Sequence, residues 1–375
     1  ISAADQVAGG DGTDTVKLYA TTTVPAVSGV ENVEIYNATS ASLDLSSTAN
    51  SGITSLTLSG YEAVAASVYT IKQGDTISLI DALDTTNNTD DVNIAAAATV
   101  TSATVNVTNS GVDTTADIEL DFTGTGMKTV TINALGSEAS FINIEAATAG
   151  VTLTDVIINA TSALTITDID DATTINASGS TGAVTLTTAI DAVSITGGSG
   201  DDIINMGTTY DYSATAPDTI DGGAGFDILI LDDADIVQTK AQTAVTNIEA
   251  IQSSSALAAA NHDVSKFGVN HFIFDVDTAL GATITGTSGL TIETSKLVDD
   301  IGATANTIIA LSDSAGAGDV VNFVIKDQSA ANASDFDFTA AGVETINVDA
   351  SIATVAIDLG LNAAQASVLT VLAGS

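Results

Sequence analysis

Short runs of alternating apolar and polar residues recur along almost the whole chain of 375 residues. The clearest are SLTLSG at 55–60, ATVTSATVNVTN at 98–109, KTVTINA at 128–134, ALTITDI at 163–169, AVTLTT at 183–188 and ATITGTSGLTIETS at 282–295. A period of two predicts half-buried strands, and the abundant Thr, Val and Ile favour them. Clusters of Gly, Asn, Asp and Ser separate the runs and predict turns. The chain is therefore expected to be all-β.

Helical periodicity is sparse. Asp235–Val245, Ser253–Phe267 and Asn362–Leu372 carry it best, and each is expected to form a short helix.

Internal similarity favours stacked coils over separate domains. The segment DFTGTGMKTVTINA at 121–134 aligns without gaps on DFTAAGVETINVDA at 337–350. The phrase Asn-Val/Ile-Glu recurs at 32–34, 143–145 and 247–249. We therefore expect segments of parallel β-helix or β-roll, a β-solenoid with insertions, in which each coil buries an apolar face against the next. The spacing of the phrase, roughly a hundred residues, keeps a β-sandwich array as the alternative.

Three approximate segments are expected. Residues 1–120 form a β-rich segment that opens with a glycine loop, and residues 121–235 form a β-helix or β-roll with stacked glycine nonapeptides. Residues 236–375 form a β-rich segment with short helices. Because the sequence starts at Ile1, without Met or a signal region, and ends in a repeat-like stretch, we expect a fragment of a longer protein.

The charge is extreme, because 7 cationic side chains stand against 47 acids and give a net charge of −40. Phosphate binding needs basic patches that this chain lacks, so nucleic acid is excluded as a partner. Self-repulsion of this size disfavours a compact fold unless counter-cations bind. The chain has no Cys, which excludes disulfides and Cys-based zinc sites. No apolar run is long enough to span a membrane.

Three glycine-rich loops share the pattern Gly-Gly-x-Gly-x-Asp-x-apolar-x, at 9–17, 197–205 and 222–230. Glycine tolerates positive φ, so carbonyl oxygens can turn inward, and the sixth position adds the carboxylate of Asp14, Asp202 or Asp227. Ca²⁺ takes about six to eight oxygen ligands at roughly 2.3–2.6 Å. The pattern matches the nonapeptide of the calcium-binding parallel β-roll and predicts several bound Ca²⁺ ions, against the alternative of purely structural turns.

The second and third loops start 25 residues apart, at Gly197 and Gly222. Two nonapeptides complete one turn of a β-roll, so loops on the same edge lie about eighteen residues apart. Residues 206–221 resemble an enlarged nonapeptide of the opposite edge, with Asp218 at its sixth position. The two glycine loops are therefore expected to stack directly. For Asp14, in the first loop, the sequence shows no stacking partner.

The resemblance to the β-roll family also implies a ligand set. In that family one loop gives the carbonyls of its first and third positions and its Asp, and the next gives the carbonyls of its second and fourth positions and its Asp. Carried onto this chain, the ligands are Gly197, Ser199, Asp202, Gly223, Gly225 and Asp227, with Asp14 and Asp218 as further candidates.

Other acidic clusters are weaker candidates, because turn carboxylates are often simply solvated. These are Asp90–Asp91, the group Asp168, Asp170 and Asp171, the group Asp232, Asp233 and Asp235, and Asp299–Asp300.

Catalytic motifs are missing from the sequence. His262 and His271 do not form a zinc-protease motif and are expected to be surface or capping residues, and no nucleophile elbow or dinucleotide fingerprint occurs. We therefore do not expect an enzyme.

The nonapeptides, the strands rich in Thr, Ala, Gly and Val, the lack of Cys and the phrase GVENVEIYNATSASLDLS at 29–46 together resemble bacterial RTX surface-layer proteins of the Caulobacter and Campylobacter type. The resemblance implies a calcium-dependent structural protein that assembles with itself into a two-dimensional lattice on the cell surface. It also implies export by type I secretion and anchoring to lipopolysaccharide through another segment. The alternatives are the stalk of a secreted RTX adhesin or biofilm protein, and the β-roll of a secreted protease or lipase.

Overall fold

The computed structural model describes residues 6–19, 24–37, 42–63, 67–84, 92–112, 114, 116–146, 153–169, 171–188, 190, 192–212, 217–238, 240–275, 281–294, 300–301, 307–313, 317–326, 334–351, 357–363 and 366–373. Parallel stacked strands form a β-solenoid of about 12 turns, and 3% of the chain is helical. The predicted stacked β-coils are confirmed. The β-sandwich alternative is wrong, because the strand registers described are parallel, whereas sandwiches are built from antiparallel sheets.

Two compact units make up the chain. The first contains residues 1–203 and 223–225, and the second contains residues 204–222 and 226–375. The three expected segments, 1–120, 121–235 and 236–375, stay a prediction.

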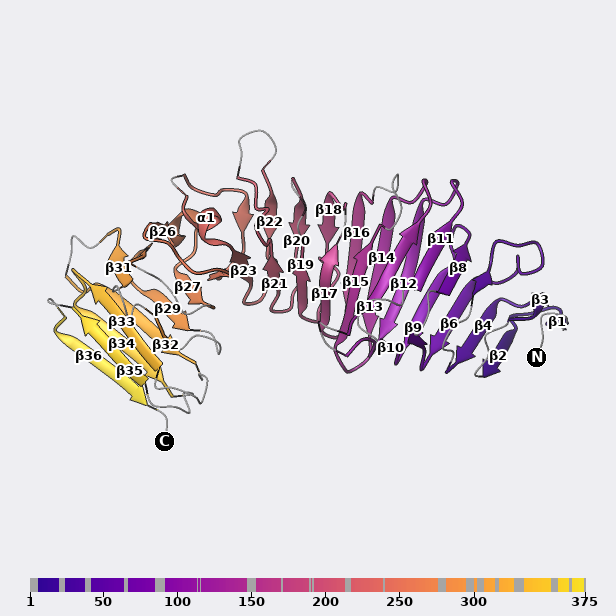
Figure 1. The fold of residues 1–375 in the computed structure, drawn as a ribbon, viewed down its shortest axis with the longest axis horizontal. Helices are drawn as coiled ribbons and strands as arrows, with labels where there is room; N and C mark the ends of the chain where they lie inside the picture. The colour runs from indigo at the N-terminus through magenta and orange to yellow at the C-terminus, as the bar shows by residue number, and fades with distance from the viewer. Residues whose placement is uncertain are drawn as a thin grey trace. The chain divides into compact units, whose positions relative to one another are not determined.

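Two long parallel sheets form the first unit (Figure 1). One contains, in spatial order, β2 (Thr15–Tyr19), β4 (Asn32–Tyr36), β6 (Ser55–Ser59), β9 (Thr76–Ile80), β12 (Ser102–Thr108), β14 (Thr129–Leu135), β16 (Asp155–Ala160), β18 (Thr174–Asn176) and β20 (Ser194–Thr196). The other contains β5 (Leu43–Asp44), β8 (Ser67–Ile71), β11 (Val92–Ala96), β13 (Ile118–Thr123), β15 (Ser140–Glu145), β17 (Leu164–Ile169) and β19 (Val184–Thr187). Two short pairs join β1 (Gln6–Ala8) to β3 (Ala26–Ser28) and β7 (Glu62–Ala63) to β10 (Leu83–Asp84).

The second unit repeats this plan. One run of strands contains β21 (Ile203–Asn205), β23 (Ile228–Leu231), β25 (Ala250–Ser253), β27 (His271–Phe274), β29 (Leu290–Thr294), β32 (Val320–Ile325), β34 (Thr345–Ala350) and β36 (Val368–Ala373). A second sheet contains β26 (Asn261–Asp263), β28 (Thr283–Gly286), β31 (Thr307–Leu311) and β33 (Ser334–Ala340), and both β30 (Asp300–Ile301) and β35 (Ile357–Asn362) pair with β33. β22 (Thr219–Asp221) pairs with β24 (Val245–Thr246).

Coil length varies along the solenoid. Thr15 pairs with Asn32, 17 residues later, whereas Thr76 pairs with Thr104, 28 residues later. The inward face stays constant because strand alternation is kept: Val105, Ile132 and Ile158 pair in register and are fully buried. Insertions therefore lengthen the turns without shifting the core.

A corner residue, here the residue immediately before a strand, sets the register of each coil. The carbonyl oxygen of Lys128 accepts the backbone N–H of Thr154 at 2.8 Å and that of Asp155 at 3.1 Å. The carbonyl of Thr154 does the same for Thr173 and Thr174 on the following coil. The hydroxyl groups of Thr154 and Thr173 donate to the same carbonyls, at 3.2 and 3.1 Å. This use of the hydroxyl accounts for threonine at these corners.

The helices expected from the sequence are mostly wrong. Of the segment at 235–245 only the start is helical, in α1 (Asp233–Ile236), and of 253–267 only the end, as the 3₁₀ helix η1 (Val264–Phe267). Residues 362–372 end β35 and form most of β36. β36 pairs with β34 from Thr345 to Ala350, so the neighbouring strand satisfies its backbone and overrides the helical pattern.

An asparagine ladder runs along the outer face of β12, β14 and β16. The side chain of Asn133 donates to Asn106 Oδ1 at 2.8 Å, and Asn159 donates to Asn133 Oδ1 at 2.9 Å. Replacing Asn133 by Ala removes both bonds and leaves two half-buried amides with one partner fewer.

We expect Asn133→Ala to lower the free energy of unfolding by about 1–2 kcal/mol. Denaturant unfolding monitored by circular dichroism measures this change. Thr131→Ala is the matched control, because Thr131 lies on the same face of the same strand. Equal effects of the two substitutions would contradict a stabilising ladder.

Candidate metal-binding loops

All three glycine loops lie at turns between consecutive strands. The first joins β1 to β2, the second joins β20 to β21, and the third joins β22 to β23. The apolar residue at the eighth position lies on the strand that follows, and Ile204 and Leu229 are buried there. The turn-then-strand arrangement predicted for the nonapeptides is confirmed.

Within the first unit, three turns stack on one edge of the solenoid. The N–H of Ser199 donates to the carbonyl of Ser180 at 3.0 Å, and the N–H of Ala224 donates to the carbonyl of Gly198 at 3.0 Å. Gly223 has φ +100°, and a Cβ there would lie 2.2 Å from Gly198 O. The stacking predicted for the second and third loops is therefore found, and it requires glycine at 223.

Asp202 closes its own loop. Its Oδ2 accepts the N–H of Gly198 and its Oδ1 accepts the N–H of Val184, both at 2.7 Å, and the side chain is buried. Burial raises the pKa of Asp202, and the two backbone N–H groups oppose that shift. Of the predicted ligands, the first unit brings together Gly197, Ser199 and Asp202 with Gly223 and Gly225.

Asp227 belongs to the second unit and is fully buried. Its N–H donates to Glu249 Oε2 at 2.8 Å, and its carbonyl accepts the N–H groups of Glu249 and Ala250. A Cβ on Gly222 would lie 2.8 Å from Asp227 Oδ2, so the first glycine of the loop makes room for the carboxylate. Glu249 is a neighbour that the nonapeptide pattern does not predict.

Asp14 has a stacking partner that the sequence does not reveal. Its N–H donates to Glu31 Oε2 at 2.8 Å, and its carbonyl accepts the N–H groups of Glu31 and Asn32. A Cβ on Gly9 would overlap Gly29 O and would lie 2.8 Å from Asp14 Oδ2. The first loop is therefore built like the third.

Asp218 closes the excursion between β21 and β22. Its Oδ2 accepts the N–H of Asp211 at 2.6 Å, and its own N–H donates to the carbonyl of Asp211 at 2.7 Å. The side chain is fully buried, at the sixth position of the enlarged nonapeptide.

A further carboxylate group lies on the strands β13 and β15. One oxygen from each of Glu119, Asp121 and Glu145 lies within 4.8 Å of the others, and Asp121 pairs in register with Glu145. Such a group can hold a metal ion. The sequence does not reveal it because the two strands are separated by a turn, and only the parallel register brings their carboxylates together.

The weaker acidic clusters have mixed surroundings. Asp232 caps α1 by accepting the N–H of Asp235, and Asp233 accepts the N–H of Ala258 and pairs with His262 at 2.7 Å. His262 is fully buried, so the expected surface position is wrong for it. Asp90–Asp91, Asp170 and Asp299 lie outside the described residues.

Asp235 is the titratable group of this cluster with the largest perturbation. Burial, the charge of Asp232 and the charge of Asp218 raise its pKa to about 7. Its folded pKa lies above the unfolded value of about 3.9, so its contribution to stability is full below pH ~4 and is lost as the pH rises towards 7.

In excess chelator, Asp235→Asn is expected to unfold at a higher temperature than wild type at pH 7 and at the same temperature at pH 4. Thermal melts across this range measure the difference. A constant difference between the two proteins at all pH values would contradict the buried titration.

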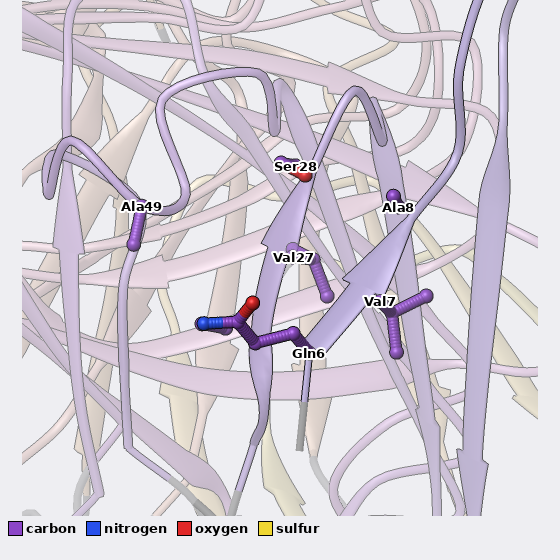
Figure 2. Close-up of a pocket in the computed structure, with 7 residues that line it drawn as sticks. Gln6, Val7, Ala8, Val27, Ser28 and Ala49 are labelled. Carbon is purple, nitrogen blue, oxygen red and sulfur yellow. The ribbon is translucent and has the colours of Figure 1, made fainter. Parts of the chain in front are cut away.

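The hollow between β1 and β3 carries no chemistry of this kind. Figure 2 shows its lining residues, and its volume is about 420 Å³. Gln6, Val7, Ala8, Ala26, Val27, Ser28 and Ala49 line it. It contains no carboxylate and so does not belong to the acidic sites.

Comparison with known proteins gives no relative. No family model matches the chain, and no curated protein matches its sequence. Among the described residues, no helix is long and apolar enough to cross a membrane.

Proposed function

We propose that this chain is a calcium-binding structural segment of a bacterial surface layer, and that it assembles with copies of itself into a two-dimensional lattice. The observation that carries the proposal is the stacking of glycine turns, each with an aspartate at the same position, in a chain of net charge −40. Carbonyl and carboxylate oxygens are the ligands that Ca²⁺ prefers, and bound cations reduce the self-repulsion.

Calcium would couple export to folding. Where calcium is scarce, the charge keeps the chain extended and suited to type I secretion. Outside the cell, calcium at millimolar concentration fills sites of the extracellular class, whose dissociation constants are about 10⁻⁴–10⁻³ M. Ions bound only by the folded state stabilise it by mass action. Ions shared between neighbouring copies would join acidic surfaces, and a segment outside this chain would anchor the layer to lipopolysaccharide.

Electron microscopy of the purified chain, with calcium added at millimolar concentration, tests the proposal. An ordered lattice that dissolves in excess chelator supports it, and the same concentration of Mg²⁺ is the control. Separate rods in calcium would favour the adhesin stalk. Sheets that persist unchanged in chelator would rule out the calcium mechanism.

A further inference from the structure

One arrangement of corner residues occurs three times, with an aspartate on one coil and a glutamate on the next. The pairs are Asp14 with Glu31, Asp227 with Glu249 and Asp319 with Glu344. In each pair the glutamate Oε2 accepts the aspartate N–H, at 2.8, 2.8 and 3.0 Å. In return, the aspartate carbonyl accepts the N–H groups of the glutamate and of the residue after it. We refer to these pairs as Asp–Glu corners.

The chain before each glutamate is also the same. The residue two positions earlier has positive φ, namely Gly29 at 56°, Asn247 at 51° and Gly342 at 79°. The residue between them is a buried aliphatic one, Val30, Ile248 or Val343. Two of the three corners end predicted calcium loops. The third, at Asp319, matches no glycine nonapeptide, because Gly318 directly precedes the aspartate.

The Asp–Glu corners place like charges on neighbouring coils, whereas the corners at Thr154 and Thr173 use a neutral hydroxyl for the same carbonyl. A glutamine at the second position would also accept the aspartate N–H, so the hydrogen bond alone does not require a second charge. Two adjacent carboxylates without a cation are destabilising. The repeated choice of glutamate therefore indicates a cation.

The corner at Asp319 has a second feature that points to a ligand. Its side chain is only 7% exposed, and its Oδ2 has no hydrogen-bond partner among the described residues. A buried carboxylate oxygen without a partner is costly. Glu344 and Asp313 are the charged groups that face it, and with burial they raise the pKa of Asp319. In the described part of the chain, no lysine forms an ion pair with any of the three.

Asp75 shows how the same problem is solved when a cation is built in. It also directly precedes a strand and is buried, but Lys72 lies 2.9 Å from its Oδ1. Asp319 lacks such a partner and stands beside two further acids.

We propose that the Asp319–Glu344 corner, with Asp313, is a binding site for Ca²⁺ outside the glycine nonapeptides. Asp319 Oδ2 and the carboxylates of Glu344 and Asp313 supply a hard, oxygen-only ligand set of charge −3, and water completes the coordination. The inference rests on the proposed calcium function for the identity of the ion, and it extends that function to a corner that no sequence motif marks.

Calcium titration calorimetry on the full chain tests the site, starting from metal-free protein. Asp319→Asn and Glu344→Gln should each bind one ion fewer than wild type, because both keep the backbone hydrogen bonds and lose a carboxylate. In chelator both variants should melt no lower than wild type, because like charges are removed. Glu138→Gln, at an exposed turn, is the matched control and should bind as many ions as wild type.

The outcomes separate this inference from the proposed function. If wild type binds no calcium, both fail. If wild type binds calcium and Asp202→Asn loses an ion, but Asp319→Asn and Glu344→Gln bind as many as wild type, the Asp319 site alone is refuted. Variants that melt lower in chelator, with unchanged ion number, would show that the corner is only a structural contact.

Discussion

In calcium at millimolar concentration, the chain is expected to unfold at a much higher temperature than in excess chelator. Each site filled only in the folded state adds about 2.7 kcal/mol at a hundred-fold excess of calcium over its dissociation constant. The buried carboxylates of Asp202, Asp227 and Asp319 are among those that gain most, because burial removes the water that would otherwise solvate them. Several sites together would make this the largest effect of any single change of conditions.

Thermal melts at fixed ionic strength measure the shift, with Mg²⁺ and monovalent salt as controls. Screening of net charge by any salt gives a small rise that does not depend on the cation. A specific rise in Ca²⁺ alone supports oxygen-lined sites. Equal melting temperatures in Ca²⁺, Mg²⁺ and chelator would contradict calcium-dependent folding.

Gly223→Ala is expected to be the most damaging substitution in the loops. The φ of +100° costs an alanine about 1–2 kcal/mol. The added Cβ would also lie 2.2 Å from Gly198 O, a backbone atom that cannot move aside, and overpacking of this kind costs a further 1–3 kcal/mol or so. The hydrogen bond from Ala224 to Gly198 should weaken as the turns separate.

Gly10→Ala separates the two causes. Gly10 occupies the same loop position with φ +101°, but nothing lies within 4 Å of its Cβ position. It should therefore show the backbone cost alone. Denaturant unfolding of both variants in calcium measures the difference, and equal destabilisation would contradict tight stacking at 223.

The fold class was predictable because alternation of Thr, Val and Ile reports strands directly. Coil lengths were not, because the corners accept insertions without disturbing the inward residues, as the pairs 15/32 and 76/104 show. The segments at 121–134 and 337–350 do have the same organisation: each runs from the end of a strand through a turn and a corner residue, Lys128 or Glu344, into the next strand.

The candidate sites were predictable only where one loop contains the whole pattern. The three Asn-Val/Ile-Glu phrases suggested equivalent positions, and this interpretation is wrong. Glu34 lies within β4 and pairs with Lys17, Glu145 ends β15, and Glu249 precedes β25. The true equivalents of Glu249 are Glu31 and Glu344.

Contacts between coils explain what the sequence could not show. The glutamates of the Asp–Glu corners follow their aspartates by 17, 22 and 25 residues, so no fixed spacing marks them. The asparagine ladder left a weak signal in Asn106, Asn133 and Asn159, which recur at 27 and 26 residues.

An anomalous-difference map of the protein crystallised with calcium tests the central claim most directly. The account predicts peaks beside the stacked turns of Gly197–Asp202 and Gly222–Asp227, at roughly 2.3–2.6 Å from carbonyl and carboxylate oxygens. A well-ordered map with no peak at either turn would contradict it.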